Sequence, residues 1–178
     1  MFKRISPHAS FALAAGLALL AVQSALALTS APVVVSGDGV TGVKVVRNDE
    51  PVTTKSTSYS AVQASRTTIQ VPDGTNALIL ARFTGESVCY GGAANNWCTA
   101  RIMVGGNQAQ PSGDDVAFDS TDNGAESRHS WESHSIERVR GPLGPGSYQV
   151  EVQVKTSSPA VTFRLDDWTL VIERVVTT

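Results

Sequence analysis

The stretch that decides the fold is Ser147-Tyr148-Gln149-Val150-Glu151-Val152-Gln153-Val154-Lys155, in which polar and apolar side chains alternate. Successive side chains of a β-strand point to opposite faces, so the apolar residues share one face and the polar ones the other. A strand with one face in a core and one in water is typical of antiparallel sheets. No stretch of the chain repeats apolar residues at the helical spacing over three turns.

The composition supports the same fold class. The 178 residues leave room for one domain, or two at most. Residues 28–178 contain 21 Val, 5 Ile and 16 Thr, against 6 Leu and 1 Met, and β-branched side chains favour strands over helices. The formal net charge is −2, which excludes a polybasic nucleic-acid surface as the dominant feature.

The first 27 residues have the pattern of a secretory signal peptide. Lys3 and Arg4 precede an apolar stretch from Phe11 to Val22, and Ser24-Ala25-Leu26-Ala27 ends in an Ala-x-Ala cleavage pattern. The apolar stretch is shorter than the roughly 20 residues that span a bilayer. We therefore predict export of a chain that begins near Leu28, to the periplasm or the extracellular space, without a membrane span.

Short alternating segments separated by turn residues fill the remainder of the chain. The expected strands are Val33–Val35, Thr41–Arg47, Ser58–Val62, Thr67–Val71, Ala77–Gly85, Cys98–Val104, Asn107–Gln110, Val116–Asp119, Ser130–Arg138, Ser147–Thr156 and Thr162–Val175. They predict a single all-β domain, a two-sheet antiparallel β-sandwich of jelly-roll-like type. Residues 28–60 would form an N-terminal arm and the first strands, and residues 61–178 the core of the same domain.

The two cysteines, Cys89 and Cys98, flank a short segment that is expected to be a loop. An even number of cysteines in an exported chain favours a disulfide. The spacing does not match a Cys-x-x-Cys redox or metal motif, so we predict a structural disulfide.

The apolar pattern of the last strand changes phase at Asp166-Asp167. Phe163 and Leu165 share one face, whereas Trp168 and the apolar residues after it fall in the opposite phase. A β-bulge would restore them all to one face. Two interpretations remain open: a corner at which the strand passes to the other sheet, or a ligand site that uses Asp166, Asp167 and Trp168.

A second unusual segment contains Trp131, Glu132 and His134. Trp131 falls on one face of the expected strand, and Glu132 and His134 on the other. A tryptophan is most often part of a core, but an aromatic ring beside an acid is also typical of a sugar-binding surface. We include the three residues among the candidate ligand-binding residues.

An oxygen-rich run contains Asp119, Asp122 and Glu126. Extracellular calcium binds such loops, so Ca²⁺ is the one cofactor for which the sequence offers ligands. The alternative is a simple turn, because Asn123-Gly124 favours a positive φ.

Catalytic motifs are not found. There is no Gly-x-Ser-x-Gly elbow and no phosphate-binding glycine loop. His129 and His134 are five residues apart, which places them on opposite faces of a regular strand. We therefore predict a protein that is not an enzyme.

Two segments stand near the end of the chain: Pro142-Leu143-Gly144-Pro145-Gly146-Ser147-Tyr148-Gln149-Val150-Glu151-Val152 and then Phe163-Arg164-Leu165-Asp166-Asp167-Trp168-Thr169-Leu170. Together they resemble the final hairpin of jelly-roll carbohydrate-binding modules. They also resemble the hairpin of C1q/TNF-like jelly rolls, and the whole chain resembles uncharacterised secreted bacterial β-sandwich proteins. The first resemblance implies a non-catalytic module that binds extracellular glycans. The second implies a structural protein that self-associates. A third hypothesis is a hydrolase that pairs Asp166 or Asp167 with Glu132. An exposed ring of Trp97, Trp131 or Trp168 would favour glycan binding.

Overall fold

The computed structural model describes residues 33–37 and 41–177, and the predicted signal peptide, residues 1–27, lies outside this part. The described residues form strands and one short 3₁₀ helix, η1 (Asp122–Gly124), with no α-helix among them. The strands are β1 (Val33–Gly37), β2 (Thr41–Asn48), β3 (Val52–Thr54), β4 (Ser60–Ala61), β5 (Thr67–Val71), β6 (Asn76–Gly91), β7 (Trp97–Val104), β8 (Asn107–Gln108), β9 (Ala117–Ser120), β10 (Glu132–Leu143), β11 (Gly146–Thr156) and β12 (Val161–Thr177). The all-β prediction is confirmed.

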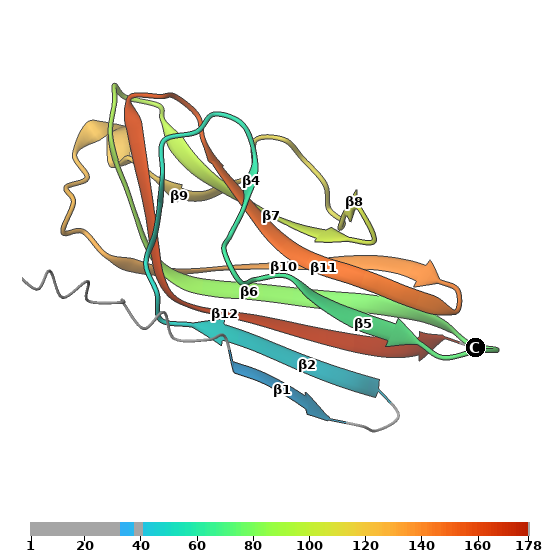
Figure 1. Cartoon of the computed structure of the whole chain (residues 1–178). Coiled ribbons are helices and arrows are strands. Elements are labelled where there is room, and N and C mark those ends of the chain that lie inside the picture. Colours follow the sequence, from blue (N-terminus) through green and yellow to red (C-terminus); the bar gives the residue numbers. More distant parts are fainter. Residues whose placement is uncertain (1–32, 38–40, 178) are drawn as a thin grey trace, which may run out of the picture.

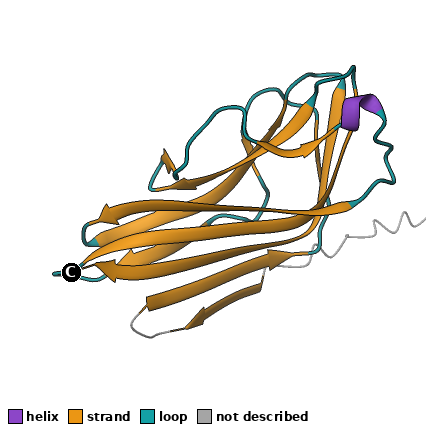
Figure 2. Ribbon diagram, turned by 180° about the vertical axis from the view of Figure 1, so that it is seen from behind, coloured by secondary structure: helices purple, strands orange, loops and turns teal. Residues whose placement is uncertain are grey.

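The strands form two sheets that lie face to face (Figures 1 and 2). Sheet A has the order β1-β2-β12-β6-β10, with β3 paired to β12. Sheet B has the order β4-β11-β7-β8, with β5 paired to β11 and β9 paired to β7. The pairing within both sheets is antiparallel. The predicted two-sheet antiparallel β-sandwich is therefore confirmed.

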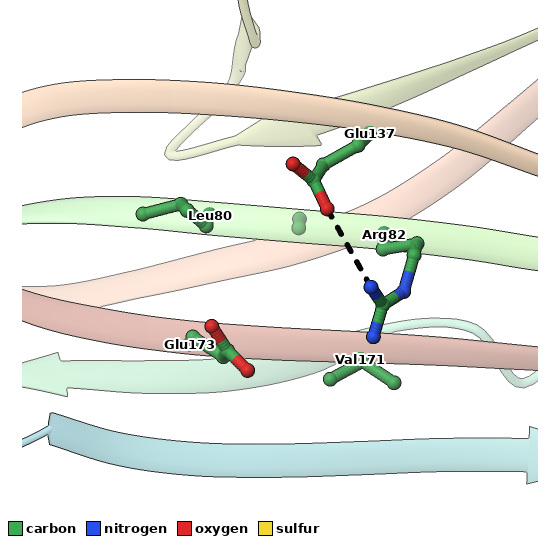
Figure 3. A pocket seen from close by; sticks show the side chains of 6 residues that line it. Leu80, Arg82, Glu137, Val171 and Glu173 are labelled. Atoms are coloured by element: carbon green, nitrogen blue, oxygen red, sulfur yellow. Dashed lines mark ion pairs between the residues drawn. The ribbon is translucent and has the colours of Figure 1, made fainter.

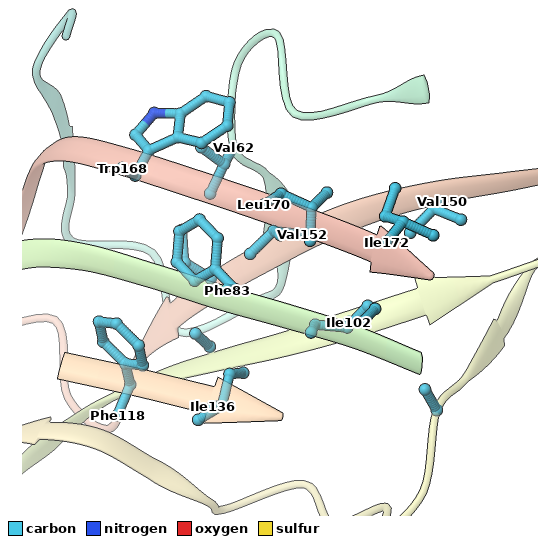
Figure 4. Close-up of a cluster of buried hydrophobic side chains, with 14 of the residues drawn as sticks. Val62, Phe83, Ile102, Phe118, Ile136, Val150, Val152, Trp168, Leu170 and Ile172 are labelled. Carbon is cyan, nitrogen blue, oxygen red and sulfur yellow. The ribbon is translucent and has the colours of Figure 1, made fainter. Parts of the chain in front are cut away.

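The alternating stretch forms β11 and supplies sheet B's share of the core. Val150, Val152 and Val154 are at most 1% exposed and belong to the apolar core. Figure 4 shows Val150 and Val152 facing apolar side chains of sheet A, among them Phe83 and Leu170. Burial of a single such side chain stabilises the fold by about 1.5–3 kcal/mol. The interior between the sheets is therefore the main source of stability.

Glu151, expected on the water-facing side of β11, is only 8% exposed. Its carboxylate oxygen Oε2 lies 2.8 Å from Nη2 of Arg66, and the amides of Gln149 and Gln153 donate to the same carboxylate. The outer face of the strand is thus polar as predicted, but long side chains cover this acid.

The longest strands are β6 and β12, and they pair along almost their whole length. β6 was expected over Ala77–Gly85 and instead runs from Asn76 to Gly91, so Cys89 lies in the strand rather than in a loop. The strand β3 was not predicted, because three residues beside Pro51 are too few to show alternation. β2 and β3 pair with β12, so residues before 60 contribute to sheet A.

The phase change in β12 is a β-bulge, as predicted. The pairing with β6 shifts between Asp166 and Thr169, and Asp167 has a φ of 42°. Leu165 and Trp168, on either side of the bulge, are both 1% exposed. The strand does not pass to the other sheet. It stays in sheet A and exchanges one neighbour, β3, for another, β2.

The disulfide prediction is confirmed. Cys89 lies in β6 of sheet A and Cys98 in β7 of sheet B, with their Cα atoms 5.9 Å apart and both residues fully buried. The bond therefore links the two sheets at the end of the sandwich where β6 turns into β7. No helix of the described residues is both long and apolar enough to cross a membrane.

Candidate functional site

The disulfide-linked end of the sandwich carries the candidate site. The loop of residues 92–96 connects β6 to β7, and η1 follows β9 at the same end. β9 pairs with β7, so that Ser120 lies opposite Trp97. In Figure 2 η1 and the C-terminus lie at opposite ends of the molecule.

An open hollow of about 350 Å³ lies between these segments. Its lining residues are Asn95, Asn96, Trp97, Ala117, Ser120, Asp122 and Asn123. The indole of Trp97 is half-buried, and its covered Nε1 has no hydrogen-bond partner. Asn95, Asp122 and Asn123 are exposed, and within the described part their side chains make no hydrogen bond or ion pair. These three exposed side chains are therefore available to a ligand, whereas Nε1 of Trp97 is covered.

Backbone contacts hold the walls of the hollow in place. The carbonyl oxygen of Asn96 accepts hydrogen bonds from N and Oγ1 of Thr121, at 3.1 and 3.0 Å. Its side-chain Oδ1 accepts one from Oγ of Ser157 at 3.0 Å. On the other wall, N of Gly124 donates to O of Thr121 at 2.7 Å, in a turn where Asn123 has a φ of 55°. Asn and Gly tolerate this conformation at little cost.

The lining combines an indole, three carboxamides, a hydroxyl and one carboxylate, with no cationic side chain. Carboxamides both donate and accept hydrogen bonds, and an indole offers an apolar face. This combination suits a neutral molecule with many hydroxyl groups. The sequence prediction missed Asn95, Asn96 and Asn123, because loop amides show no periodic pattern.

The bulge residues do not lie in this hollow. Trp168 is 1% exposed, and its ring centroid is 6.0 Å from that of Phe83 in the core. The stacking role predicted for Trp168 does not fit this burial. Asp166 is half-buried on the outward face of sheet A, opposite Glu86, and Asp167 is exposed.

Trp131 and Glu132 lie on different faces of sheet A. The guanidinium carbon of Arg164 is 4.8 Å from the ring centroid of Trp131, and Arg164 points outward because both its neighbours are in the core. Glu132 pairs with Ser87, whose side chain points inward. Asp166 and Glu132 therefore lie on opposite faces, and this pair of carboxylates does not converge.

His134 belongs to a buried polar network that no sequence pattern predicted. Ser87, fully buried in β6, donates from Oγ to Oδ2 of Asp119 at 2.6 Å. The same Oγ lies 3.1 Å from Nδ1 of His134, and Nε2 of His134 lies 3.6 Å from Oε2 of Glu132. The feature of the sequence that could have indicated this network is Ser87, a polar residue at a core position of β6. Because Ser87 is inaccessible and bonded to the acid, it is not an exposed nucleophile.

Asp119 is buried because β9 contains its own irregularity. The pairing of β9 with β7 shifts between Cys98 and Thr99, so two successive side chains, Phe118 and Asp119, are both buried. Burial raises the pKa of Asp119 above its ordinary value, whereas the hydrogen bond from Ser87 and the nearby His134 act in the opposite direction.

The three acids predicted as calcium ligands are divided between two environments. Asp122 lines the hollow, whereas Asp119 faces Ser87 in the interior. Glu126 is half-buried, with an Oε2 that has no hydrogen-bond partner. The described residues contain no group of three or more His, Cys, Asp or Glu side chains arranged to hold a metal ion. Calcium binding by these acids stays a prediction.

A second depression lies on the outward face of sheet A. It has a volume of about 20 Å³ and is lined by residues that include Arg82 and Glu137, whose charged groups are 3.7 Å apart (Figure 3). That volume holds about one water molecule, so the depression is too small for an organic ligand.

The fold and the hollow define a β-sandwich protein with a polar depression at one end. No family model and no curated protein matches the chain. Among solved structures, it is similar to a carbohydrate-binding module, CBM6cm-2, from Cellvibrio mixtus lichenase 5A in complex with cellotriose. The identity is 13%, the match covers 80% of this chain and 86% of the module, and the TM-score is 0.33.

It is also similar to dimeric latent PorU from Porphyromonas gingivalis, with 14% identity over 72% of this chain and 13% of PorU, and a TM-score of 0.37. Similarities at this level carry no argument about what the chain binds.

Proposed function

We propose that the chain is a secreted, non-catalytic β-sandwich module that binds the end of a neutral glycan in the hollow beside Trp97. The observation that supports this is the gathering of an indole with unpartnered amide and carboxylate groups in an open, rigidly held depression. Sugar rings use both kinds of contact, stacking through C–H groups and hydrogen-bonding through hydroxyls. The signal-peptide pattern and the disulfide are consistent with export.

Charge and size narrow the class of glycan. The lining contains one carboxylate and no cation, so an anionic sugar would meet a repulsive charge without a compensating ion pair. The volume is at the lower end of the roughly 300–1,000 Å³ that small-molecule sites occupy. We therefore expect recognition of one or two sugar units of a neutral chain.

The test uses the exported protein and two kinds of probe. Neutral cello-, xylo- and manno-oligosaccharides are compared with anionic oligogalacturonates by isothermal titration calorimetry. We expect binding of at least one neutral series. Asn123→Gly, which keeps the positive φ but removes the carboxamide, and Asp122→Asn should weaken that binding at least about tenfold, the loss expected for one or two hydrogen bonds.

The matched control is Asp73→Asn, in the turn before β6 at the other end of that 16-residue strand. It should bind as the wild type does. Failure of every neutral probe to bind, or equal effects of Asp73→Asn and Asp122→Asn, would contradict the proposal.

Two further predictions accompany this function. Mass spectrometry of the exported protein should find an N-terminus at or near Leu28, and an intact Met1 would contradict secretion through a cleaved signal.

Self-association, the alternative function, stays a prediction. Light scattering coupled to size-exclusion chromatography tests it directly, and an oligomer that does not bind neutral glycans would favour the structural role.

A further inference from the structure

Two side chains with possible metal-binding atoms, those of Glu132 and His134, lie close together at the N-terminal end of β10. Glu132 and His134 are two residues apart on one strand, so their side chains share a face. Oε2 of Glu132 and Nε2 of His134 are 3.6 Å apart, and the two side chains are 63% and 27% exposed. Solvent and ions can therefore reach both atoms.

The buried network fixes the orientation of the imidazole. Ser87 donates its single hydroxyl proton to Oδ2 of Asp119. The Ser87 oxygen must then accept from His134, which places the ring proton on Nδ1. In the neutral ring Nε2 then carries the lone pair, 3.6 Å from Oε2 of Glu132, so the two unprotonated atoms repel each other. A cation between the two atoms would turn this repulsion into attraction.

The geometry suits a metal ion. Two ligands of one tetrahedral zinc ion, each about 2.0–2.1 Å from the metal, lie roughly 3.3–3.4 Å apart, close to the observed 3.6 Å. Metal-binding histidines typically donate their other ring N–H to a carboxylate, a carbonyl or a water. Here the hydroxyl oxygen of Ser87 accepts the hydrogen bond from Nδ1 of His134, and its own proton is donated to Asp119.

We propose that Glu132 and His134 form a two-residue site for a divalent transition metal of the Zn²⁺ or Cu²⁺ class, with water in the remaining positions. Imidazole nitrogen with one carboxylate favours these metals over Ca²⁺ and Mg²⁺, which prefer oxygen ligands. Ser87 and Asp119 are positioning residues, because they act through the ring of His134. The site lies outside the hollow and does not depend on the proposed glycan binding.

The test titrates the exported, tag-free protein with ZnCl₂ by isothermal titration calorimetry, and separately with CuCl₂ while tryptophan fluorescence is followed. We expect one equivalent of Zn²⁺ to bind, and CaCl₂ in excess not to compete. Glu132→Gln and His134→Gln should each weaken Zn²⁺ binding at least about tenfold. Ser87→Ala should weaken it by roughly 10-fold through the loss of ring orientation.

His129→Gln is the matched control, since His129 is an exposed histidine on the preceding loop. It should bind Zn²⁺ as the wild type does. Because Glu132 is the more exposed partner, Glu132→Gln keeps the test valid even where His134→Gln folds poorly. No binding at submillimolar Zn²⁺ or Cu²⁺, or a loss with His129→Gln rather than with Glu132→Gln, would overturn the proposal.

Discussion

The two sides of β9 differ in how their polar groups are used. On the side of the hollow, Ser120 and the neighbouring Asp122 and Asn123 face solvent. On the inner side, Asp119 is buried and bonded to Ser87. A single irregularity in the pairing with β7 separates the two environments. Two acids only three residues apart in the sequence, Asp119 and Asp122, therefore have different roles.

The comparison shows how polar groups in this fold can be interpreted. A buried polar group needs a partner inside the protein, and the partner of Asp119 makes it part of the structure. An exposed polar group in a rigid depression has no protein partner to give up. It can therefore exchange its bound water for a ligand hydroxyl, with a net gain of about 0.5–1.5 kcal/mol per hydrogen bond. Changes on the inner side should therefore affect stability, and changes in the hollow should affect binding.

The largest expected effect on stability comes from removing the disulfide between Cys89 and Cys98, which links the two sheets at this end of the sandwich. Replacing Cys89 and Cys98 by serine should lower the free energy of unfolding by about 2–3 kcal/mol, because the short loop gains conformational freedom in the unfolded chain. Urea unfolding followed by circular dichroism measures this change. The β spectrum should persist in the variant, and a loss of all secondary structure would show that the core depends on the bond.

A somewhat smaller loss should follow from Ser87→Ala. The buried carboxylate of Asp119 then loses its donor, at a cost of about 1–3 kcal/mol in unfolding free energy at neutral pH. Glycan affinity should stay at the wild-type value, since Ser87 does not line the hollow. Equal losses in stability and in glycan affinity would show that the two sides of β9 are not independent.

The sequence allowed the sandwich to be predicted because β11 and much of β12 follow a period of two, and because β-branched residues are abundant throughout the chain. The phase change at Asp166-Asp167 located the bulge for the same reason. The candidate site was less accessible. The irregularity beside Phe118 involves one residue, and Ser87 meets Asp119 and His134 only through contacts between distant segments. Loop residues such as Asn95 carry no periodic signal at all.

The titration of Asp119 offers a third test. Burial raises the pKa of Asp119 in the folded state, so the folded protein holds this proton more tightly than the unfolded chain does. The contribution of Asp119 to stability therefore falls as pH rises from below its ordinary pKa through the raised value, and stays low above it. Asp119→Asn keeps an acceptor for Ser87 but cannot titrate.

The measurement is urea unfolding of both proteins over the acidic pH range. The stability of the wild type relative to Asp119→Asn should decrease as pH rises through this window and then become constant. A relative stability that increases with pH would mean that the ionised acid is favoured in the fold, contrary to the direction inferred from its burial.

The smallest effect on stability should come from the bulge. The sequence made Asp166 and Asp167 candidate ligand-binding residues, but neither lines the hollow. Asp166→Asn and Asp167→Asn preserve shape and keep an acceptor for N of Asp167, which donates to Oδ1 of Asp166 at 3.0 Å. Asn also tolerates the positive φ at position 167. Each change should therefore alter the unfolding free energy by less than about 0.5 kcal/mol. With a neutral oligosaccharide as probe, both variants should also bind as the wild type does, because neither residue lines the hollow. Loss of binding in either variant, with Asp122→Asn still active, would move the ligand site from the loops beside Trp97 to the outward face of sheet A.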